Sequence, residues 1–143
     1  MRESRLVCFS TSLDRKEISD YVYLEDRCLT SMEKERKVRN LRKEFEEQQK
    51  KSDKKVKKVI AIKRQDTGKV IGLVYLDCTK LPFSVKLDIE IPNEQLARRY
   101  GSEAVYKVVG SLLDEDDVFG VEFNEDNPII CWYIKERGVP SKA

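Results

Sequence analysis

The chain has 143 residues, of which 40% are hydrophobic and 38% are charged, with 28 basic residues against 26 acidic ones. This is enough apolar material for one compact core, which excludes a wholly disordered chain, and a net charge of +2 does not favour a dedicated nucleic-acid binder. No run reaches the ~20 apolar residues that a membrane span needs, and the N-terminus lacks the apolar stretch of a signal peptide. We therefore expect a cytoplasmic protein, with residues 1–143 forming a single domain.

The first third of the chain predicts a strand followed by two helices. Residues 5–9 form a short apolar run typical of a strand. Asp14 and Glu17 have the spacing of a capping box, and apolar residues then recur at helical spacing as far as residue 29. The segment 32–58 carries 12 Lys/Arg against 6 Asp/Glu, a net charge of +6, and Val38, Leu41 and Phe45 recur in it at helical spacing.

Two interpretations of this basic segment stay open. It is either a cationic helix that attracts an acidic partner or phosphates, or an exposed helix with one narrow apolar stripe. We favour the second interpretation, because glutamates interleaved with basic residues at i, i+4 spacing are typical of exposed helices.

The rest of the chain predicts four strands and two helices. The runs 56–62 and 70–76 flank turn residues and predict a hairpin, and residues 85–91 alternate strictly between apolar and charged side chains. A helix over 102–113, a strand over 118–123 and a helix from Pro128 that Gly138 ends complete the chain. The order β–α–α–β–β–β–α–β–α, with a helix between the last two strands, predicts an α/β fold with a sheet of mixed direction.

Two residue types limit the chemistry of the chain. Without any histidine, Ser-His-Asp and Cys-His catalysis are excluded, as are imidazole metal ligands. The four cysteines have no close pair, so we expect no metal site and predict that these side chains are small and mostly buried: Cys8, Cys28, Cys78 and Cys131. Any chemistry must use carboxylates, tyrosines, hydroxyls, backbone dipoles or a reactive cofactor.

The junction after strand 85–91 is suited to phosphate binding. We expect a loop over residues 92–101 and then a helix, an arrangement that directs unpaired backbone N–H groups and the positive end of the helix dipole into the loop. Arg98 and Arg99 add positive charge, Gly101 permits close backbone approach, and Ser102 is placed to cap the helix or to donate to a phosphate. The alternative is an ordinary strand-to-helix connection.

Four segments of the chain resemble the GNAT superfamily of acyl-CoA-dependent N-acyltransferases, in its RimJ/RimL-like branch. Residues 100–104, Tyr-Gly-Ser-Glu-Ala, are similar to the segment that opens the central helix of that family. Residues 3–7 resemble its first strand, residues 66–72 its hairpin and residues 127–139 its last helix. The resemblance implies a GNAT-like, mixed but mostly antiparallel central sheet flanked by helices, whose fourth and fifth strands splay to admit the pantetheine of acetyl-CoA.

The resemblance also implies the residues of the site. Pantetheine pairs with the backbone of the fourth strand, the pyrophosphate lies on the following loop, and an asparagine contacts the pantetheine arm. The corresponding positions are Ile89, Glu90 and Ile91, then Leu96, Ala97, Arg98, Arg99, Tyr100, Gly101 and Ser102, and finally Asn127. An amine attacks the thioester directly, with Glu90 and Asp88 as candidate bases, Tyr133 as a candidate hydroxyl and no metal. Glu90 has an alternative interpretation, in which it pairs with Lys86 or with a lysine of the basic segment.

Three positions depart from the family pattern. Leu96 stands where the family has Gln or Arg, Arg99 where it has Gly, and Ile130 where it often has Ser. Only residues 140–143 follow the segment that resembles the last helix, in place of closing strands, so we expect an open sheet edge and a homodimer.

The sequence therefore predicts an acetyl-CoA-dependent N-acetyltransferase that acts on a primary amine of a small molecule or a protein N-terminus. The departures favour an alternative, a catalytically degenerate GNAT-fold interaction module. A second alternative is a small α/β adaptor whose cationic helix docks on acidic protein or RNA. The expected partners are acetyl-CoA, an amine acceptor and a second copy of the chain, with no membrane.

Overall fold

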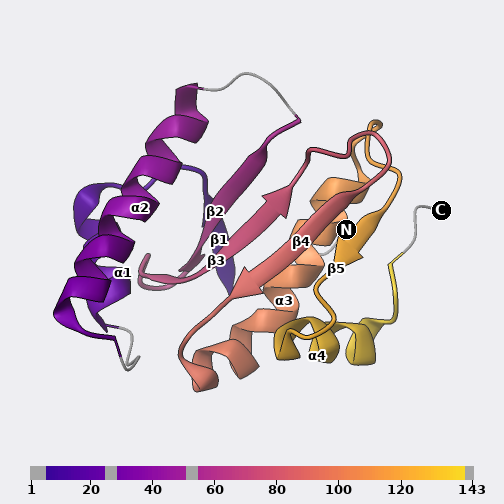
Figure 1. Cartoon of the computed structure of the whole chain (residues 1–143). Coiled ribbons are helices and arrows are strands. Elements are labelled where there is room, and N and C mark those ends of the chain that lie inside the picture. The colour runs from indigo at the N-terminus through magenta and orange to yellow at the C-terminus, as the bar shows by residue number, and fades with distance from the viewer. Residues whose placement is uncertain (1–5, 25–28, 51–54, 141–143) are drawn as a thin grey trace.

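A computed structural model describes residues 6–24, 29–50 and 55–140 of the chain (Figure 1). In this part of the chain, one sheet has the strand order β1-β2-β3-β4-β5, and four helices flank it. The strands are β1 (Val7–Ser10), β2 (Lys57–Arg64), β3 (Val70–Asp77), β4 (Val85–Glu90) and β5 (Val121–Phe123). The helices are α1 (Arg15–Leu24), α2 (Ser31–Lys50), α3 (Glu94–Leu113) and α4 (Pro128–Arg137).

The sheet is mixed but mostly antiparallel, which confirms the predicted fold class and element order. Strands β1 to β4 are antiparallel neighbours, whereas β5 runs parallel to β4, and α3 is the crossover that a parallel pair requires. β4 and β5 pair over three positions only, Val85–Leu87 with Val121–Phe123. Within the described residues, no strand pairs with the remainder of β4 on this side.

Helices cover both faces of the sheet, and an apolar cluster lies under each pair (Figure 1). α3 and α4 pack on the face that receives Val85, Leu87 and Ile89 of β4. α1 and α2 pack on the opposite face through a second cluster that includes Ile18 and Phe45. Because side chains alternate along a strand, the charged residues of β4 face the side of α1 and α2.

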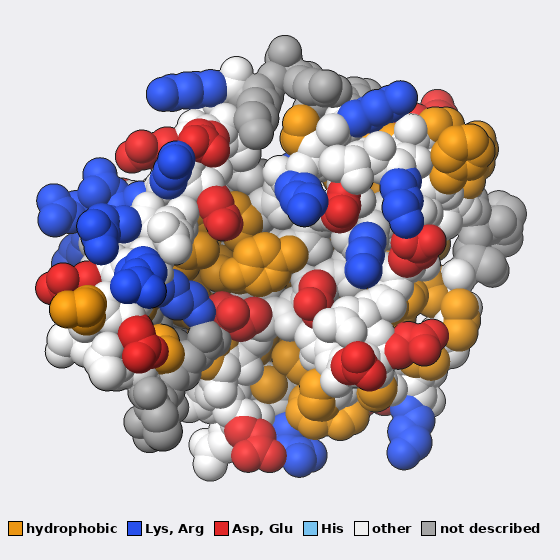
Figure 2. Space-filling model, in the orientation of Figure 1, with side chains coloured by type: hydrophobic (Ala, Val, Ile, Leu, Met, Phe, Trp, Pro, Cys, Tyr) orange, Lys and Arg blue, Asp and Glu red, His pale blue; other side chains and the backbone are white. Residues whose placement is uncertain are grey.

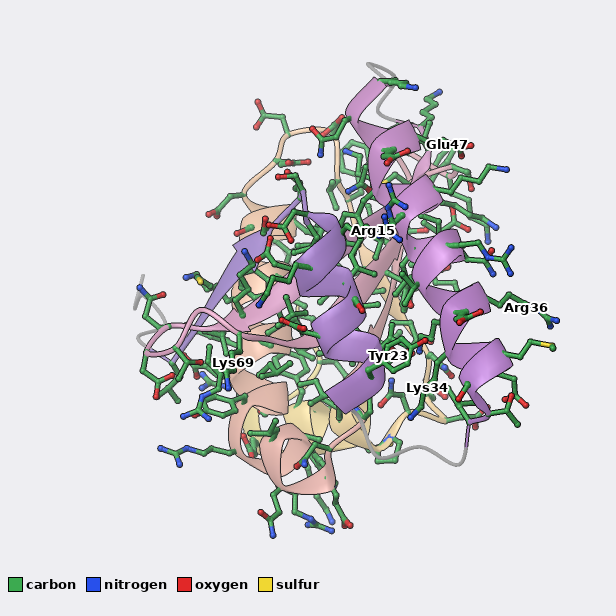
Figure 3. The ribbon with its side chains drawn as sticks, turned by 90° about the vertical axis from the view of Figure 1, so that its left-hand side faces the viewer. Arg15, Tyr23, Lys34, Arg36, Glu47 and Lys69 are labelled. Carbon is green, nitrogen blue, oxygen red and sulfur yellow. The ribbon has the colours of Figure 1, made fainter. Side chains whose placement is uncertain are left out.

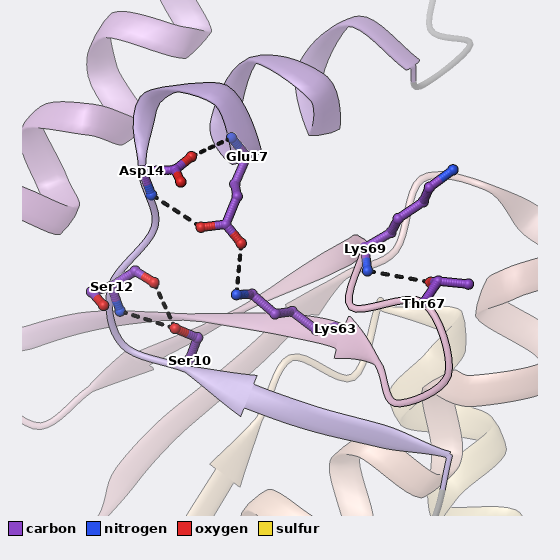
Figure 4. Close-up of polar contacts among 7 residues, drawn as sticks. All are labelled: Ser10, Ser12, Asp14, Glu17, Lys63, Thr67 and Lys69. Carbon is purple, nitrogen blue, oxygen red and sulfur yellow. Dashed lines mark hydrogen bonds and ion pairs between the residues drawn. The ribbon is translucent and has the colours of Figure 1, made fainter.

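α1 begins at the predicted capping box (Figure 4). The Asp14 carboxylate accepts a hydrogen bond from the Glu17 N–H at 2.7 Å, and the Glu17 carboxylate accepts one from the Asp14 N–H at 3.2 Å. Glu17 also pairs with Lys63 of β2 at 2.6 Å, which ties the start of the helix to the sheet. The helix ends at Leu24. Leu29 is not helical, so the prediction of a helix as far as residue 29 is wrong there, and residues 25–28 lie outside the described part.

α2 is an exposed helix with a narrow buried stripe, as the favoured interpretation of the basic segment predicts. Its buried residues are Leu41 and Phe45. Figure 3 shows Arg36 directed away from the rest of the molecule and Lys34 beside Tyr23 of α1, with the Lys34 Nζ 5.6 Å from the centre of the ring. No helix in the described ranges is long and apolar enough to cross a membrane.

The connection between β4 and α3 is shorter than predicted. α3 begins at Glu94 because Asn93 caps it, with the Asn93 side-chain oxygen accepting the Leu96 N–H at 3.0 Å. Residues 96–101, predicted as a loop, therefore lie in the first turns of the helix. Ser102 is not the cap, and its hydroxyl instead donates to Glu136 of α4 at 2.7 Å.

Two smaller predictions also need correction. The strand predicted over 118–123 comprises only Val121–Phe123. Val118, predicted to begin it, lies buried in the loop before the strand. Cys131 is exposed, whereas Cys78 is buried and Cys8 is half-buried; Cys28 lies outside the described residues.

Candidate functional site

β4 and β5 separate beyond Leu87, and side chains from the β5–α4 connection bridge the opening. We call this region the fork and define it as residues 88–91 of the chain together with Asn124 and Asn127. The Asn127 amide nitrogen donates to the Ile89 carbonyl at 2.6 Å and to the Asp88 carboxylate at 2.8 Å. The Asn127 oxygen caps α4 by accepting the Ile129 N–H at 3.0 Å. Asn127 therefore links the edge of β4 to the start of α4.

Asp88 is the polar centre of the fork. One of its carboxylate oxygens accepts from Asn127 and also from the Ile89 N–H at 2.9 Å. The other oxygen accepts from the Asn124 amide at 3.1 Å. Both oxygens of this candidate base are thus used as hydrogen-bond acceptors.

The backbone of β4 is only partly available at the fork. Because peptide groups alternate along a strand, those of Ile89 and Ile91 face the fork and those of Glu90 face β3. Both groups of Ile89 are bonded, its N–H to Asp88 and its carbonyl to Asn127. Ile91 is only 6% exposed, and its N–H and carbonyl have no partner among the described residues. Ile91 therefore offers one donor and one acceptor.

The start of α3 lies next in the chain and carries positive charge. The backbone N–H groups of Glu94 and Gln95 have no hydrogen-bond partner in the described part, as is usual in a first helical turn. Arg98 pairs with Glu94 at 3.2 Å, and its guanidinium carbon lies 5.0 Å from the ring centre of Trp132 in α4. Together with Lys135, Arg98 and Trp132 line a shallow hollow of about 240 Å³.

The other residues predicted around the phosphates have different surroundings. Ala97, Tyr100 and Gly101 are buried on the inner side of α3. Leu96 is half-buried, whereas Arg99 is exposed, with its guanidinium 5.3 Å from the Tyr100 ring centre. The two arginines are thus exposed to solvent, whereas Ala97, Tyr100 and Gly101 are not.

A groove of about 430 Å³ runs between α2 and the sheet (Figure 2). Tyr75 forms its floor, in register with Val59 on one side and Asp88 on the other. Glu44 and Glu47 of α2 form its wall. Neither of their carboxylates has an ion-pair or hydrogen-bond partner among the described residues. Burial, together with the nearby Glu47 charge, raises the pKa of Glu44 above its ordinary value. Lys57, Lys58, Asp77 and Lys86 also line the groove.

Glu90 is held by groups from both α1 and α2. One of its carboxylate oxygens accepts from the Tyr21 hydroxyl at 2.6 Å and from the Lys37 ammonium at 3.4 Å. The alternative interpretation of Glu90, a pair with a lysine of the basic segment, is thereby confirmed. Lys37 turns inward from α2 and connects that helix to the end of β4.

Tyr133 lies on the other face of the sheet. It is buried in the cluster under α3 and α4, with its ring centre 5.9 Å from that of Phe123. Burial raises the pKa of its hydroxyl. The structure therefore does not bring Tyr133 together with Glu90, whose side chain lies on the α1–α2 side.

Sequence reasoning missed several polar residues at this end of the sheet. They are Asn124 at the fork, Glu44 and Glu47 in the groove, and Tyr21 and Lys37 around Glu90. Asn124 and Asn127 flank the short acidic turn between β5 and α4. Asparagines in such turns often hydrogen-bond to nearby backbone groups, and this spacing could have indicated a role for Asn124. Within the described residues, no group of three or more Cys, Asp or Glu side chains is placed to hold a metal ion.

Comparisons with known proteins identify the fold. No protein-family profile and no curated protein sequence matches the chain. Among solved structures, a chimera of the Vibrio cholerae spermidine N-acetyltransferase SpeG and hSSAT matches with a TM-score of 0.63 and 14% identity, over 92% of this chain and 78% of that one. A Vibrio cholerae protein proposed to be a ribosomal-protein-serine acetyltransferase matches with a TM-score of 0.61 and 11% identity, over 95% and 80% of the two chains. The chain thus has a GNAT acetyltransferase fold, which confirms the expected resemblance at the level of fold.

Proposed function

We propose that the chain is an acetyl-CoA-dependent N-acetyltransferase that acts on a primary amine. The observation that carries this proposal is the fork, where the pairing of β4 with β5 stops and the Ile91 peptide groups are left without partners close to the start of α3. An extended molecule with amide groups can hydrogen-bond to such a strand edge as an added strand does. The fold supports the same proposal, because both similar structures described above are acetyltransferases by name.

The residues present fit the two ends of such a cosubstrate. Ile91 offers one donor and one acceptor to the pantetheine amides. The free N–H groups of Glu94 and Gln95 and the positive end of the α3 dipole suit a diphosphate, and Arg98 and Arg99 add positive charge beside them. The hollow between Arg98 and Trp132 would take the remainder of the nucleotide.

The groove beside α2 suits the amine. An ammonium group is stabilised by carboxylates and by the face of an aromatic ring, and Glu44, Glu47 and Tyr75 provide both. Asp88 lines this groove and also centres the fork, so an amine in the groove would approach the fork next to Asp88. We therefore place the reacting amine at the Asp88 end of the groove.

The reaction needs positioning more than it needs a dedicated base. Acetyl-CoA supplies an acetyl group activated as a thioester. The ammonium bound in the groove first gives a proton to water. The neutral amine nitrogen then bonds to the carbonyl carbon, the carbon–sulfur bond breaks, the thiolate leaves, and the surplus proton on nitrogen passes to water. Asp88 and Glu90 already accept hydrogen bonds from several donors, so the contribution of the chain is to hold the two reactants in contact.

A second function is favoured by one specific observation, the occupied edge of Ile89. Asn127 and Asp88 already bond both peptide groups of that residue, where a pantetheine would compete for them. The Glu94 carboxylate also lies in the first turn of α3, where it opposes a bound phosphate. On this alternative, the chain is a GNAT-fold interaction module without catalysis.

Calorimetry with acetyl-CoA separates the two functions. The proposed enzyme binds acetyl-CoA well below ~1 mM, and Arg98→Ala weakens this binding about 10- to 100-fold through the loss of a charge-assisted contact. Arg15→Ala, which removes an exposed cation from α1, serves as the control and leaves the affinity unchanged. Absence of binding by the wild-type chain at millimolar acetyl-CoA would favour the interaction module.

A further inference from the structure

We propose that Asp88 is a positioning residue that holds the fork at a fixed width, rather than a proton acceptor. This inference deepens the proposed function and rests on it. Asp88 receives hydrogen bonds from three donors that belong to three parts of the chain: the Ile89 N–H of its own strand, Asn124 after β5, and Asn127 at the start of α4. One carboxylate therefore connects β4, the residue that follows β5 and the start of α4.

The geometry is poorly suited to a base. One oxygen of Asp88 already accepts two hydrogen bonds, from Asn127 at 2.8 Å and from the Ile89 N–H at 2.9 Å, so a proton on it would displace a donor. A proton on the other oxygen would weaken the hydrogen bond from Asn124 at 3.1 Å. An ionised carboxylate, by contrast, accepts all three hydrogen bonds at once. Asp88 therefore serves the fork as an acceptor of three hydrogen bonds.

The effect of Asp88 on a bound cosubstrate passes through Asn127. Both hydrogens of the Asn127 amide are directed, one to Asp88 and the other to the Ile89 carbonyl. Without Asp88, one of these hydrogens loses its acceptor, and the amide is held by two hydrogen bonds in place of three, those with the Ile89 carbonyl and the Ile129 N–H. The Ile89 carbonyl is then held less firmly, and the strand edge that would receive pantetheine loses its fixed shape.

Four variants isolate this role. Asp88→Asn keeps an oxygen for Asn127 and for the Ile89 N–H, and loses only the acceptor for Asn124. Asp88→Ala loses all three bonds. Asn127→Ser keeps a good cap for α4 but removes both amide donors, and it tests the same link if Asp88→Ala does not fold. Asp116→Ala removes an exposed carboxylate from the loop after α3 and serves as the control.

The first measurement is hydrogen exchange of the Ile89 amide without any cosubstrate. Asp88→Ala and Asn127→Ser should speed the exchange of the Ile89 amide about 10-fold or more, while Asp88→Asn and the control stay within about 3-fold of wild type. The second measurement is acetyl-CoA affinity, which should follow the same order, with a loss of about 10-fold or more for the first two variants.

Each outcome decides a separate question. Wild-type exchange in Asp88→Ala and Asn127→Ser would overturn the positioning role. Normal acetyl-CoA affinity with a loss of turnover of about 100-fold or more in Asp88→Asn would also overturn it, because only a proton acceptor requires the carboxylate itself. If the predicted exchange pattern holds but wild-type protein does not bind acetyl-CoA, the proposed function fails and the role of Asp88 in the fork stands.

Discussion

At Gly101 the backbone of α3 approaches α4 so closely that a Cβ atom would lie 2.7 Å from Cγ2 of Ile129. Gly101→Val should therefore lower the free energy of unfolding by about 1–3 kcal/mol through overpacking, measured by urea denaturation. Gly120→Ala is the control, since its Cβ would meet the Phe83 carbonyl oxygen at an ordinary 3.8 Å. A Gly101→Val protein as stable as wild type would show that the two helices can separate at little cost.

The raised pKa of Glu44 predicts that the stability of the protein depends on pH. Because its pKa is raised in the folded protein above the ordinary 4.5, the folded state binds a proton more readily than the unfolded state, and stability falls as pH rises between the two pKa values. Glu44→Gln should therefore raise the melting temperature at neutral pH and change it little below pH 4.5, where both states are protonated. Glu35→Gln, on the exposed side of α2, should change the melting temperature at neither pH. Equal effects of Glu44→Gln at both pH values would contradict this account.

Single residues were predictable from sequence where their partners are near in the chain. The Asp14–Glu17 capping box and the Asn127 cap next to Pro128 depend on neighbours within a few positions. The bonds of Asp88 were not predictable, because they join residues 36 and 39 positions apart. Those contacts exist only once the crossover has laid β5 parallel to β4.

Among the elements, α2 stabilises the sheet in an unusual way. β1 ends at Ser10, opposite Ala61, so β1 does not reach the part of β2 that contains Val59. The Gln48 amide takes its place, accepting from the Val59 N–H at 2.9 Å and donating to the Val59 carbonyl at 2.8 Å. A side chain thus continues the ladder where a strand is missing.

Gln48→Ala should cost about 1–3 kcal/mol of stability, because it leaves two peptide groups of a half-buried strand edge without partners. Thermal denaturation and exchange of the Val59 amide measure the loss. Gln49→Ala is the matched control, as its amide only donates to the exposed Thr11 carbonyl at 2.6 Å. Similar losses in the two variants would mean that the cost comes from helix–loop contacts and not from the strand edge.

The start of α3 shows how far element boundaries follow from local sequence. Pro92 and Gly101 indicate interruptions, and they led to a predicted loop between them. The structure instead uses Asn93 as the cap, and Ala97, Tyr100 and Ala104 continue the buried side of the helix by steps of three and four residues. Gly101 is tolerated inside the helix because α4 packs against it. The sequence contains both the Asn93 cap and the Gly101 interruption. Only the packing of α4 against Gly101 shows that the helix continues through this glycine.

For the molecule as a whole, the outer edge of β5 predicts self-association. Within the described residues, β5 pairs only with β4, and Phe83 and Phe119 beside it are 78% and 64% exposed. Unpaired strand edges and exposed aromatic rings both favour pairing with a second copy about a two-fold axis.

We therefore expect light scattering to give the mass of a dimer at high micromolar concentration. Phe119→Glu should shift the protein toward monomer, whereas Tyr23→Glu, which alters an exposed ring on α1, should not. A wild-type monomer over the whole concentration range would rule out this interface.

The central claim is that the fork between β4 and β5 receives the cosubstrate, and amide chemical shifts during an acetyl-CoA titration test it most directly. The account predicts the largest changes at Ile89, Ile91, Glu94 and Gln95, with saturation below about 1 mM ligand. Shifts confined to other surfaces, or none at millimolar acetyl-CoA, would contradict it.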